Sequence, residues 1–213
     1  MDFDLELDYW RNKINQNLLD VYKTGPNLLV KPIHYILNSK GKRLRPLLSL
    51  LVAEVCGGQR EAAIPVALSV EILHNFTLVH DDIMDQDVIR HGLPTVHSKW
   101  DEGTAILTGD AMLSLALKTL QNVPMNNQKI LNVFTNGLLA VCEGQAYDKE
   151  FETQSNVTVD DYLNMVDLKT GCLIGMAAEL GALSVCNDPQ LCIAMRDYGR
   201  KIGRAFQIQD DIL

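Results

Sequence analysis

Three aspartates, Asp81, Asp82 and Asp85, stand at the end of a long apolar stretch and are the residues best suited to chemistry. Helical residues four apart share one face with their Cβ atoms roughly 5–6 Å apart, so Asp81 and Asp85 point at one place. Like charges at this spacing repel each other, more strongly where water is scarce. Mg²⁺ removes the conflict, because it binds one or two carboxylates together with waters and substrate phosphates. The pattern DDIMD therefore indicates a magnesium site for a phosphorylated ligand.

Other interpretations of these carboxylates stay open. A solvated acidic helix end has the same composition, whereas a calcium loop would need a glycine and a distal glutamate that residues 81–87 lack. Arg90 favours the metal site, because a guanidinium can bind the side of a diphosphate that the metal leaves free. His91, Gly92 and Pro94 follow and are typical of a turn that ends a helix.

A second set of charges lies at Gly41–Pro46, where Lys42, Arg43 and Arg45 precede a strongly apolar helix. Basic clusters are usually solvated, but cations at the start of a core helix can also bind a phosphate there. Lys169 interrupts an otherwise apolar run rich in small residues, so it needs an anion or must extend its ammonium to water.

The hydrophobic pattern is helical throughout. We expect helices over residues 4–22, 28–37 (interrupted by Pro32), 43–56, 59–87, 103–123, 126–151 and 159–186, with a last helix opened by Asn187-Asp188-Pro189 and a loop over 95–101. Pro65 marks either a kink or a late start of the 59–87 helix. Close packing explains Gly109 inside its helix. These elements predict an all-α fold and a single domain over residues 1–213.

Composition narrows the class of protein. With 213 residues and 47% hydrophobic content the chain can bury a substantial core, and a net charge of −8 argues against nucleic acid or an anionic membrane as the main partner. Five cysteines without a C-x-x-C pair indicate reduced thiols in the cytoplasm. No uninterrupted apolar run approaches the ~18 residues that a membrane span needs. We therefore expect a soluble cytoplasmic protein.

The segment DDIMD followed by IRHGLPTVH resembles the first aspartate-rich motif of the trans-isoprenyl diphosphate synthases (polyprenyl synthetases), of the short-chain geranylgeranyl or farnesyl type. Four further segments resemble motifs of that family, in its order: Gly41–Pro46 (G-K-x-x-R-P), Gly144–Asp148 (G-Q-x-x-D), Lys169-Thr170 (K-T) and Phe206–Asp211, the start of a second aspartate-rich motif. The ordered set covers residues 41–211.

The resemblance implies an antiparallel α-helical bundle around a central cavity, in a homodimeric enzyme. It also implies that the family's later, C-terminal helices are missing. Leu213 is apolar and no helix stop signal precedes it, so we interpret the end of the sequence as a cut within a helix.

The activity implied is the Mg²⁺-dependent condensation of isopentenyl diphosphate with an allylic diphosphate to a product of about C15–C20. The implied metal ligands are Asp81, Asp85 and Asp210, and the catalytic set adds Asp82, Arg90 and Lys169. Isopentenyl diphosphate is bound by Lys42, Arg45, His74 and His91, and the allylic diphosphate by Lys169 and Thr170 with the aid of Arg90. Gln207 is a further implied substrate-binding residue. Gln145 and Asp148 are implied near the metals.

Two positions qualify the resemblance. His91 stands where the family usually has a second arginine, so we expect binding of isopentenyl diphosphate to depend on pH. Phe76, five residues before Asp81, lies roughly 7 Å deeper along a helix of ~1.5 Å rise and predicts a floor for the growing chain, for which Thr77 is too small. The alternative is that Phe76 is ordinary core and that Leu73 and Met112 set the depth.

Two rival functions remain. A class I terpene cyclase also uses an aspartate-rich helix, but it needs no isopentenyl diphosphate site, so Lys42, Arg45 and Asp210-Asp211 count against it. The other rival is a non-catalytic subunit of a heteromeric synthase, which the short chain favours.

Overall fold

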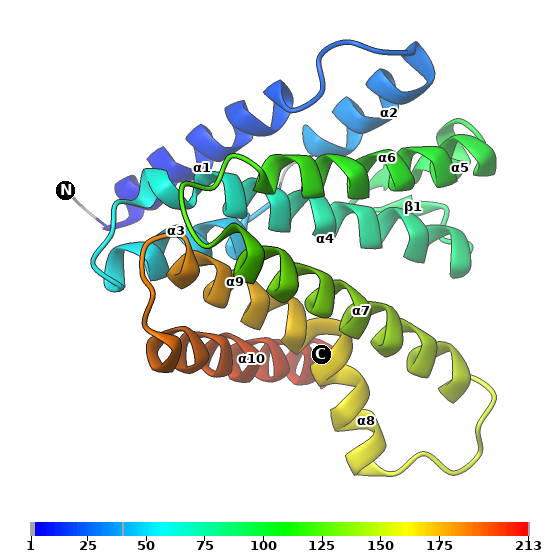
Figure 1. Cartoon of the computed structure of the whole chain (residues 1–213). Coiled ribbons are helices and arrows are strands. Elements are labelled where there is room, and N and C mark those ends of the chain that lie inside the picture. Colours follow the sequence, from blue (N-terminus) through cyan, green and yellow to red (C-terminus); the bar gives the residue numbers. More distant parts are fainter. Residues whose placement is uncertain (1–2, 40, 213) are drawn as a thin grey trace. The chain divides into compact units, whose positions relative to one another are not determined.

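A computed structural model describes residues 3–39 and 41–212, so the expectation about Leu213 lies outside the described residues. The fold is all-α, as predicted (Figure 1). Its helices are α1 (Phe3–Asp20), α2 (Asn27–Leu37), α3 (Leu44–Val55), α4 (Ile64–Met84), α5 (Val96–Lys99), α6 (Glu102–Leu120), α7 (Asn127–Phe151), α8 (Val159–Val166), α9 (Cys172–Leu183) and α10 (Pro189–Ile212), with a 3₁₀ turn η1 (Arg60–Ala63), a π-helical turn η2 (Asp167–Gly171) and two short strands, β1 (Ile89–Arg90) and β2 (Leu93–Pro94).

The helix that carries the aspartates is shorter than the sequence predicts. It begins at Ile64, after η1, so Pro65 lies in its first turn, where a missing N–H costs no hydrogen bond. It ends at Met84 because Gln86 adopts a left-handed φ of 56°. The amides of Gln86 and Asp87 then donate to the carbonyls of Ile83 and Asp82 at 3.3 and 3.0 Å, the pattern of a Schellman motif.

Three other boundaries differ from the prediction. Pro32 is buried inside α2 and does not interrupt it. The expected 95–101 loop contains the single turn α5. The expected 159–186 helix is divided by η2, after a start that a reciprocal cap between Thr158 and Asp161 fixes.

A hairpin follows the aspartates, with Ile89 paired to Pro94 and Arg90 to Leu93 in antiparallel register. Its two central residues, His91 and Gly92, both have positive φ, 51° and 76°. Two successive positive φ values are typical of a type I′ turn, whose twist matches that of a two-residue hairpin. The turn therefore fixes the direction in which Arg90 leaves the chain.

The chain forms two compact units, each considered by itself. Unit 1 comprises residues 1–47 and 68–122, and unit 2 comprises residues 48–67 and 123–213. The first contains α1, α2, α5, α6, the hairpin and most of α4; the second contains α7 to α10 and most of α3.

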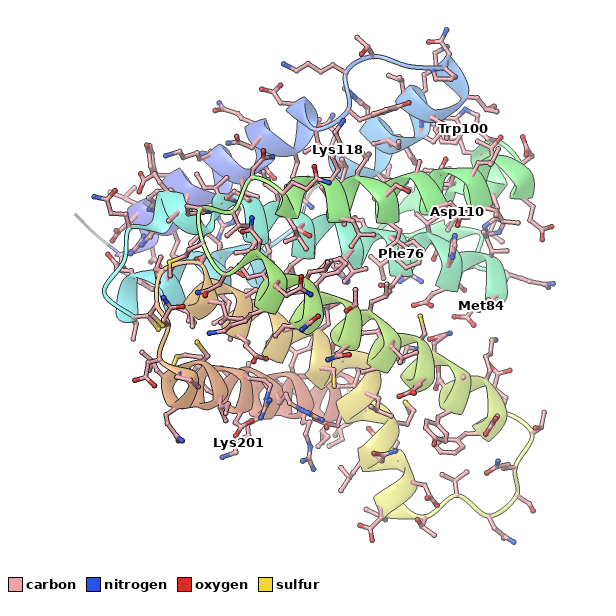
Figure 2. The ribbon with its side chains drawn as sticks, in the orientation of Figure 1. Phe76, Met84, Trp100, Asp110, Lys118 and Lys201 are labelled. Atoms are coloured by element: carbon pink, nitrogen blue, oxygen red, sulfur yellow. The ribbon has the colours of Figure 1, made fainter. Side chains whose placement is uncertain are left out.

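In unit 1, α4 and α6 pack closely. The Ser69 hydroxyl donates to the Ala116 carbonyl at 2.8 Å. A Cβ placed on Gly109 would lie 2.2 Å from Nε2 of His80, so Gly109 is required for this approach, which confirms the packing explanation. Figure 2 shows Phe76 and Met84 on α4 and Asp110, the neighbour of Gly109, on α6.

In unit 2, α9 is the central element and almost all of its residues are buried. A helix that is apolar on every side needs neighbours all round. Helices α7 and α10 supply two of them, and α3 supplies a third, because the Ser49 hydroxyl donates to the Ala177 carbonyl at 2.8 Å. Gly181 allows this contact, since a Cβ there would lie 2.4 Å from the Ser49 carbonyl oxygen.

Among the described residues, the segment Arg60–Met84 is long and apolar enough in composition to cross a membrane, and its most apolar 18-residue window has a mean hydropathy of 1.5. Counting only uninterrupted apolar runs overlooks this segment. However, 67% of its most apolar window is buried inside the fold, as in the core helix of a globular protein. It is therefore no clear membrane span.

Candidate active site

The carboxylates at the end of α4 differ in their surroundings. Asp81 is half-buried and Asp85 is exposed, one helical turn further on. Both are accessible, and the Asp85 amide donates to the Asp81 carbonyl at 2.8 Å, so helical geometry holds as far as Asp85. This arrangement places two carboxylates on one face, as the sequence predicts.

Asp82 points elsewhere. It is 5% exposed and pairs with Nε of Arg90. Nη2 of the same arginine lies 3.2 Å from Oδ2 of Asp87. Burial raises the pKa of Asp82, and the Arg90 guanidinium counters this shift. In this structure Asp82 therefore holds Arg90 in place, while Asp81 and Asp85 supply the accessible oxygens.

A group of cations lies around His74, about two turns before Asp81 on α4. Its pKa lies well below 6.5, first because of burial and then because Arg45, Arg43, Arg90 and His91 place positive charge nearby. Residues from the start of α3, from α4 and from the hairpin thus act on one imidazole. Of the predicted isopentenyl diphosphate residues, Arg45 and His91 act on His74, and Arg90, predicted at the allylic diphosphate, acts on it too. Lys42 is exposed, close to Arg45 in the sequence.

Arg43 belongs to the same basic segment but is structural. Its side chain is buried, lies 2.6 Å from Glu71, and donates to the carbonyls of Leu37 and Ser39 and to Oδ1 of Asn15. Every nitrogen of its guanidinium has an acceptor. Arg43 therefore ties α1 and the end of α2 to α4, within unit 1.

Unit 2 contains a cavity of about 200 Å³ beside η2. It is lined by Asp148, Met165, Val166, Lys169, Thr170, Gln207 and Asp211. Polar side chains form a chain of contacts in it: Lys169 lies 2.6 Å from Asp148, and Thr170 donates to Gln207 at 2.9 Å. Lys169, Thr170 and Gln207, all predicted to bind substrate, thus share one cavity.

The carboxylate that α10 contributes to this cavity is Asp211, which accepts from Gln207 at 2.8 Å and from the Tyr162 hydroxyl. Asp210, the predicted metal ligand, is exposed on α10 and is not among the lining residues. The sequence holds a signal for Asp211 that our prediction did not use, since it lies four residues after Gln207 on the same helix face.

The π-helical turn presents Lys169 and Thr170, and packing explains it. A Cβ on Gly144 of α7 would lie 2.4 Å from the Lys169 amide nitrogen, and one on Gly203 of α10 would lie 2.8 Å from Cα of Gly171. Two helices therefore approach the backbone of this turn through glycines. A π turn within an α-helix is frequently found at a functional site.

Gln145 and Asp148, expected near the metals, have different surroundings. Asp148 lines the cavity through its pair with Lys169. Gln145 is 8% exposed, and neither atom of its amide has a hydrogen-bond partner in the part of the chain that the structure describes. A buried amide without partners is costly, so Gln145 is suited to a polar group that the fold alone does not supply.

The carboxylates Asp81 and Asp85 are suited to a hard cation that a substrate phosphate also binds. Within residues 3–39 and 41–212, no three His, Cys, Asp or Glu side chains are grouped closely enough to hold a metal ion by themselves. A structural zinc site needs four protein ligands, whereas Mg²⁺ takes one or two carboxylates and completes its shell with water and phosphate. Asp81 and Asp85 fit the second pattern.

Comparison with known proteins gives the family. A sequence model of polyprenyl synthetase matches residues 26–213. Geranylgeranyl diphosphate synthase of Methanosarcina mazei is 44% identical over 89% of this chain and 60% of its own length, and geranylfarnesyl diphosphate synthase of Aeropyrum pernix is 40% identical over 94% and 65%. A crystal structure of a geranylgeranyl pyrophosphate synthase superposes with a TM-score of 0.93 at 45% identity, over 96% of this chain and 63% of that one.

The chain therefore spans about two-thirds or less of the length of these relatives. The matched segment includes the aspartates, the basic segment before α3 and the cavity of unit 2. The chain belongs to the polyprenyl synthetase family.

Proposed function

We propose that this chain carries the site of a Mg²⁺-dependent trans-prenyltransferase that condenses isopentenyl diphosphate with an allylic diphosphate to a short-chain product of about C15–C20. The observation that supports it most directly is the pair Asp81 and Asp85, two accessible carboxylates one turn apart where a buried helix ends. The name of one relative, a geranylgeranyl diphosphate synthase, agrees with a short-chain product.

Asp81 and Asp85 are the residues of unit 1 that would hold Mg²⁺, which when bound would neutralise charge on the departing diphosphate. Asp210 of unit 2 stays a predicted metal ligand. Lys169 and Thr170, with Gln207, bind the allylic diphosphate. The Lys169 ammonium leaves Asp148 and binds a phosphate oxygen. It then stabilises the negative charge that grows on the diphosphate as the carbon–oxygen bond breaks. The apolar side chains Met165 and Val166 exclude water from the allylic cation that results.

Isopentenyl diphosphate binds to the cations around His74. Arg45 and Arg90 supply guanidiniums, which match phosphate oxygens with two parallel N–H groups. His74 is kept neutral by burial and neighbouring charge, so an arriving diphosphate favours its protonated form and gains a further donor. Lys42 and His91 reach the same anion from the solvent side. The double bond then attacks the allylic carbon, and a proton leaves to the released diphosphate.

The test is a product assay with isopentenyl diphosphate, Mg²⁺ and allylic diphosphates of several chain lengths, with products identified by mass. Wild type should elongate the primer by C5 units and Asp85→Ala should not. Asp20→Ala, which removes an exposed carboxylate paired with Lys23, should match wild type. A cyclic hydrocarbon formed without isopentenyl diphosphate would instead identify a terpene cyclase. No product with any primer would favour the non-catalytic subunit. The homodimer and the cytoplasmic location remain predictions.

A further inference from the structure

Two thiols of unit 2, Cys186 and Cys192, are in contact, a third, Cys56, lies near them, and none of the three lines the cavity. Cys56 follows α3, Cys186 follows α9 and Cys192 lies in the first turn of α10. The sulfurs of Cys186 and Cys192 are 3.9 Å apart. Cys186 is also close enough to Cys56 to raise its pKa, after burial. We call Cys56, Cys186 and Cys192 the thiol cluster.

Tight packing fixes the backbone around the cluster. A Cβ on Gly58 would lie 2.3 Å from Cγ1 of Val185, so the turn after α3 is in close contact with the residue before Cys186. The Asn126 side chain donates to the carbonyls of Leu183 and Cys186 at 2.8 and 2.9 Å. The connection between α9 and α10 is thus held from two sides, and the proximity of the sulfurs does not depend on an isolated loop.

Access to the three thiols is unequal. Cys192 is 3% exposed, whereas Cys186 and Cys56 are half-buried. Burial, and then Cys186, raises the pKa of Cys192 to about 12, and burial raises that of Cys56. Both are therefore neutral thiols at physiological pH. Of the two thiols that are in contact, Cys186 is therefore the more accessible to a small oxidant, and Cys192 lies 3.9 Å from it.

A metal is a poorer occupant of this cluster. Zn²⁺ requires deprotonated thiolates in a tetrahedral set, and the described side chains hold no three-residue group with metal-binding geometry. Oxidation needs only two sulfurs that can approach. The separation of 3.9 Å must close to about 2.05 Å in a disulfide.

We propose that Cys186 and Cys192 are an oxidation site that forms a reversible disulfide with hydrogen peroxide. The Cys186 sulfur, losing its proton, attacks one peroxide oxygen; the O–O bond breaks and a sulfenic acid and one water result. The Cys192 sulfur then attacks the sulfenic sulfur, loses its proton, and displaces the second water. Two thiols are oxidised, one peroxide is reduced, and a dithiol restores both thiols. This proposal is independent of the enzymatic function proposed above.

The test is mass spectrometry of tryptic peptides after treatment of the native protein with stoichiometric peroxide and alkylation of the remaining thiols. Cys186 and Cys192 fall in one peptide, residues 170–196, which also contains Cys172, whereas Cys56 falls in residues 44–60 and Cys142 in residues 130–149. The expected result is that peptide 170–196 loses two hydrogens, keeps one alkylatable thiol, and returns to three thiols after dithiothreitol.

Variants separate this bond from its alternatives. Cys172→Ser should leave the loss of two hydrogens unchanged, whereas Cys186→Ser and Cys192→Ala should each abolish it. Thermal melts of the reduced variants establish that each variant folds. If a variant does not fold, fragmentation of the wild-type peptide locates the disulfide instead. A cross-link between peptides 44–60 and 170–196 would overturn the proposal, as would oxidation of exposed Cys142 with all three thiols of 170–196 intact.

Discussion

Nη1 of Arg43 lies 2.6 Å from Oε1 of Glu71, and both side chains are buried. This ion pair joins the basic segment before α3 to α4, the helix that ends in the aspartates. Removing one partner of a buried pair leaves an uncompensated charge, which typically costs about 3–5 kcal/mol. The pair therefore explains why Arg43, unlike its neighbours Lys42 and Arg45, stabilises the fold.

Arg43→Ala should accordingly lower the free energy of unfolding by about 3–5 kcal/mol, measured by urea denaturation. The matched control is Lys42→Ala, one residue away and exposed, which should change stability by less than ~0.5 kcal/mol. Lys42→Ala should instead weaken binding of isopentenyl diphosphate. Equal stability of the two variants would show that the buried pair is not needed.

The lowered pKa of His74 predicts how stability depends on pH. The unfolded state binds a proton near pH 6.5, the ordinary value, whereas the folded state resists protonation until lower pH. The unfolded state therefore holds more protons between the two pKa values, so stability falls as pH falls from 6.5 toward the folded pKa. Chemical denaturation at several pH values measures this slope.

His74→Asn should reduce that slope, because an amide does not titrate. Inorganic pyrophosphate should reduce it too, because a bound anion stabilises the protonated imidazole. If the wild-type and His74→Asn proteins lost stability in parallel from pH 6.5 downward, His74 would not be the titrating group.

Gly144 supplies a test of the π-helical turn. In Gly144→Ala the new Cβ would meet backbone atoms of Leu168 and Lys169 at 2.4 to 2.8 Å, and backbone cannot move aside as a side chain can. We expect a loss of stability and weaker binding of the allylic diphosphate. Gly137→Ala, on the same helix, meets only the flexible Met176 side chain and should gain up to ~1 kcal/mol from helix propensity. A higher melting temperature for Gly144→Ala than for Gly137→Ala would contradict the close packing of Gly144 against the π-helical turn.

Phe76 tests the length of the product. Its ring is 8% exposed and packs against His80 with ring centroids 4.7 Å apart. Phe76→Ala removes the largest side chain deeper on α4 than the aspartates, so products should lengthen by at least one C5 unit with the same primer. Thr77→Ala, where the side chain is already small and its hydroxyl bonds the His74 carbonyl, should leave the distribution unchanged. An unaltered distribution in Phe76→Ala with intact activity would make Phe76 ordinary core.

The sequence predicted the helices well because their apolar periodicity is local. It did not predict the π-helical turn, because that turn depends on Gly144 and Gly203, which approach it from other helices. The sequence left two alternatives for Pro65, and the structure has the late start of α4. The helix ends earlier than predicted because Gln86 adopts the left-handed conformation that glycine usually supplies at this position.

The same limit applies to the site. Lys42, Arg43 and Arg45 look alike in the sequence, and only the position of Glu71, 28 residues after Arg43, identifies the structural one. Asp82 differs from Asp81 and Asp85 because the hairpin returns Arg90 to it. By contrast, Arg45, Arg90 and His91, which act on His74 in the structure, all belong to motifs that the resemblance had already singled out in the sequence.

The most direct measurement is calorimetric titration of the protein with inorganic pyrophosphate, in Mg²⁺ and in EDTA, for wild type, Asp81→Asn and Asp85→Asn. A lost charged contact is worth about 1.5–3 kcal/mol, so each variant should bind about 10- to 100-fold more weakly in Mg²⁺. Wild type in EDTA should fall to a similar level, and all three apo proteins should be equally stable. Equal affinity of the three proteins in Mg²⁺, unchanged by EDTA, would contradict the metal site at Asp81 and Asp85.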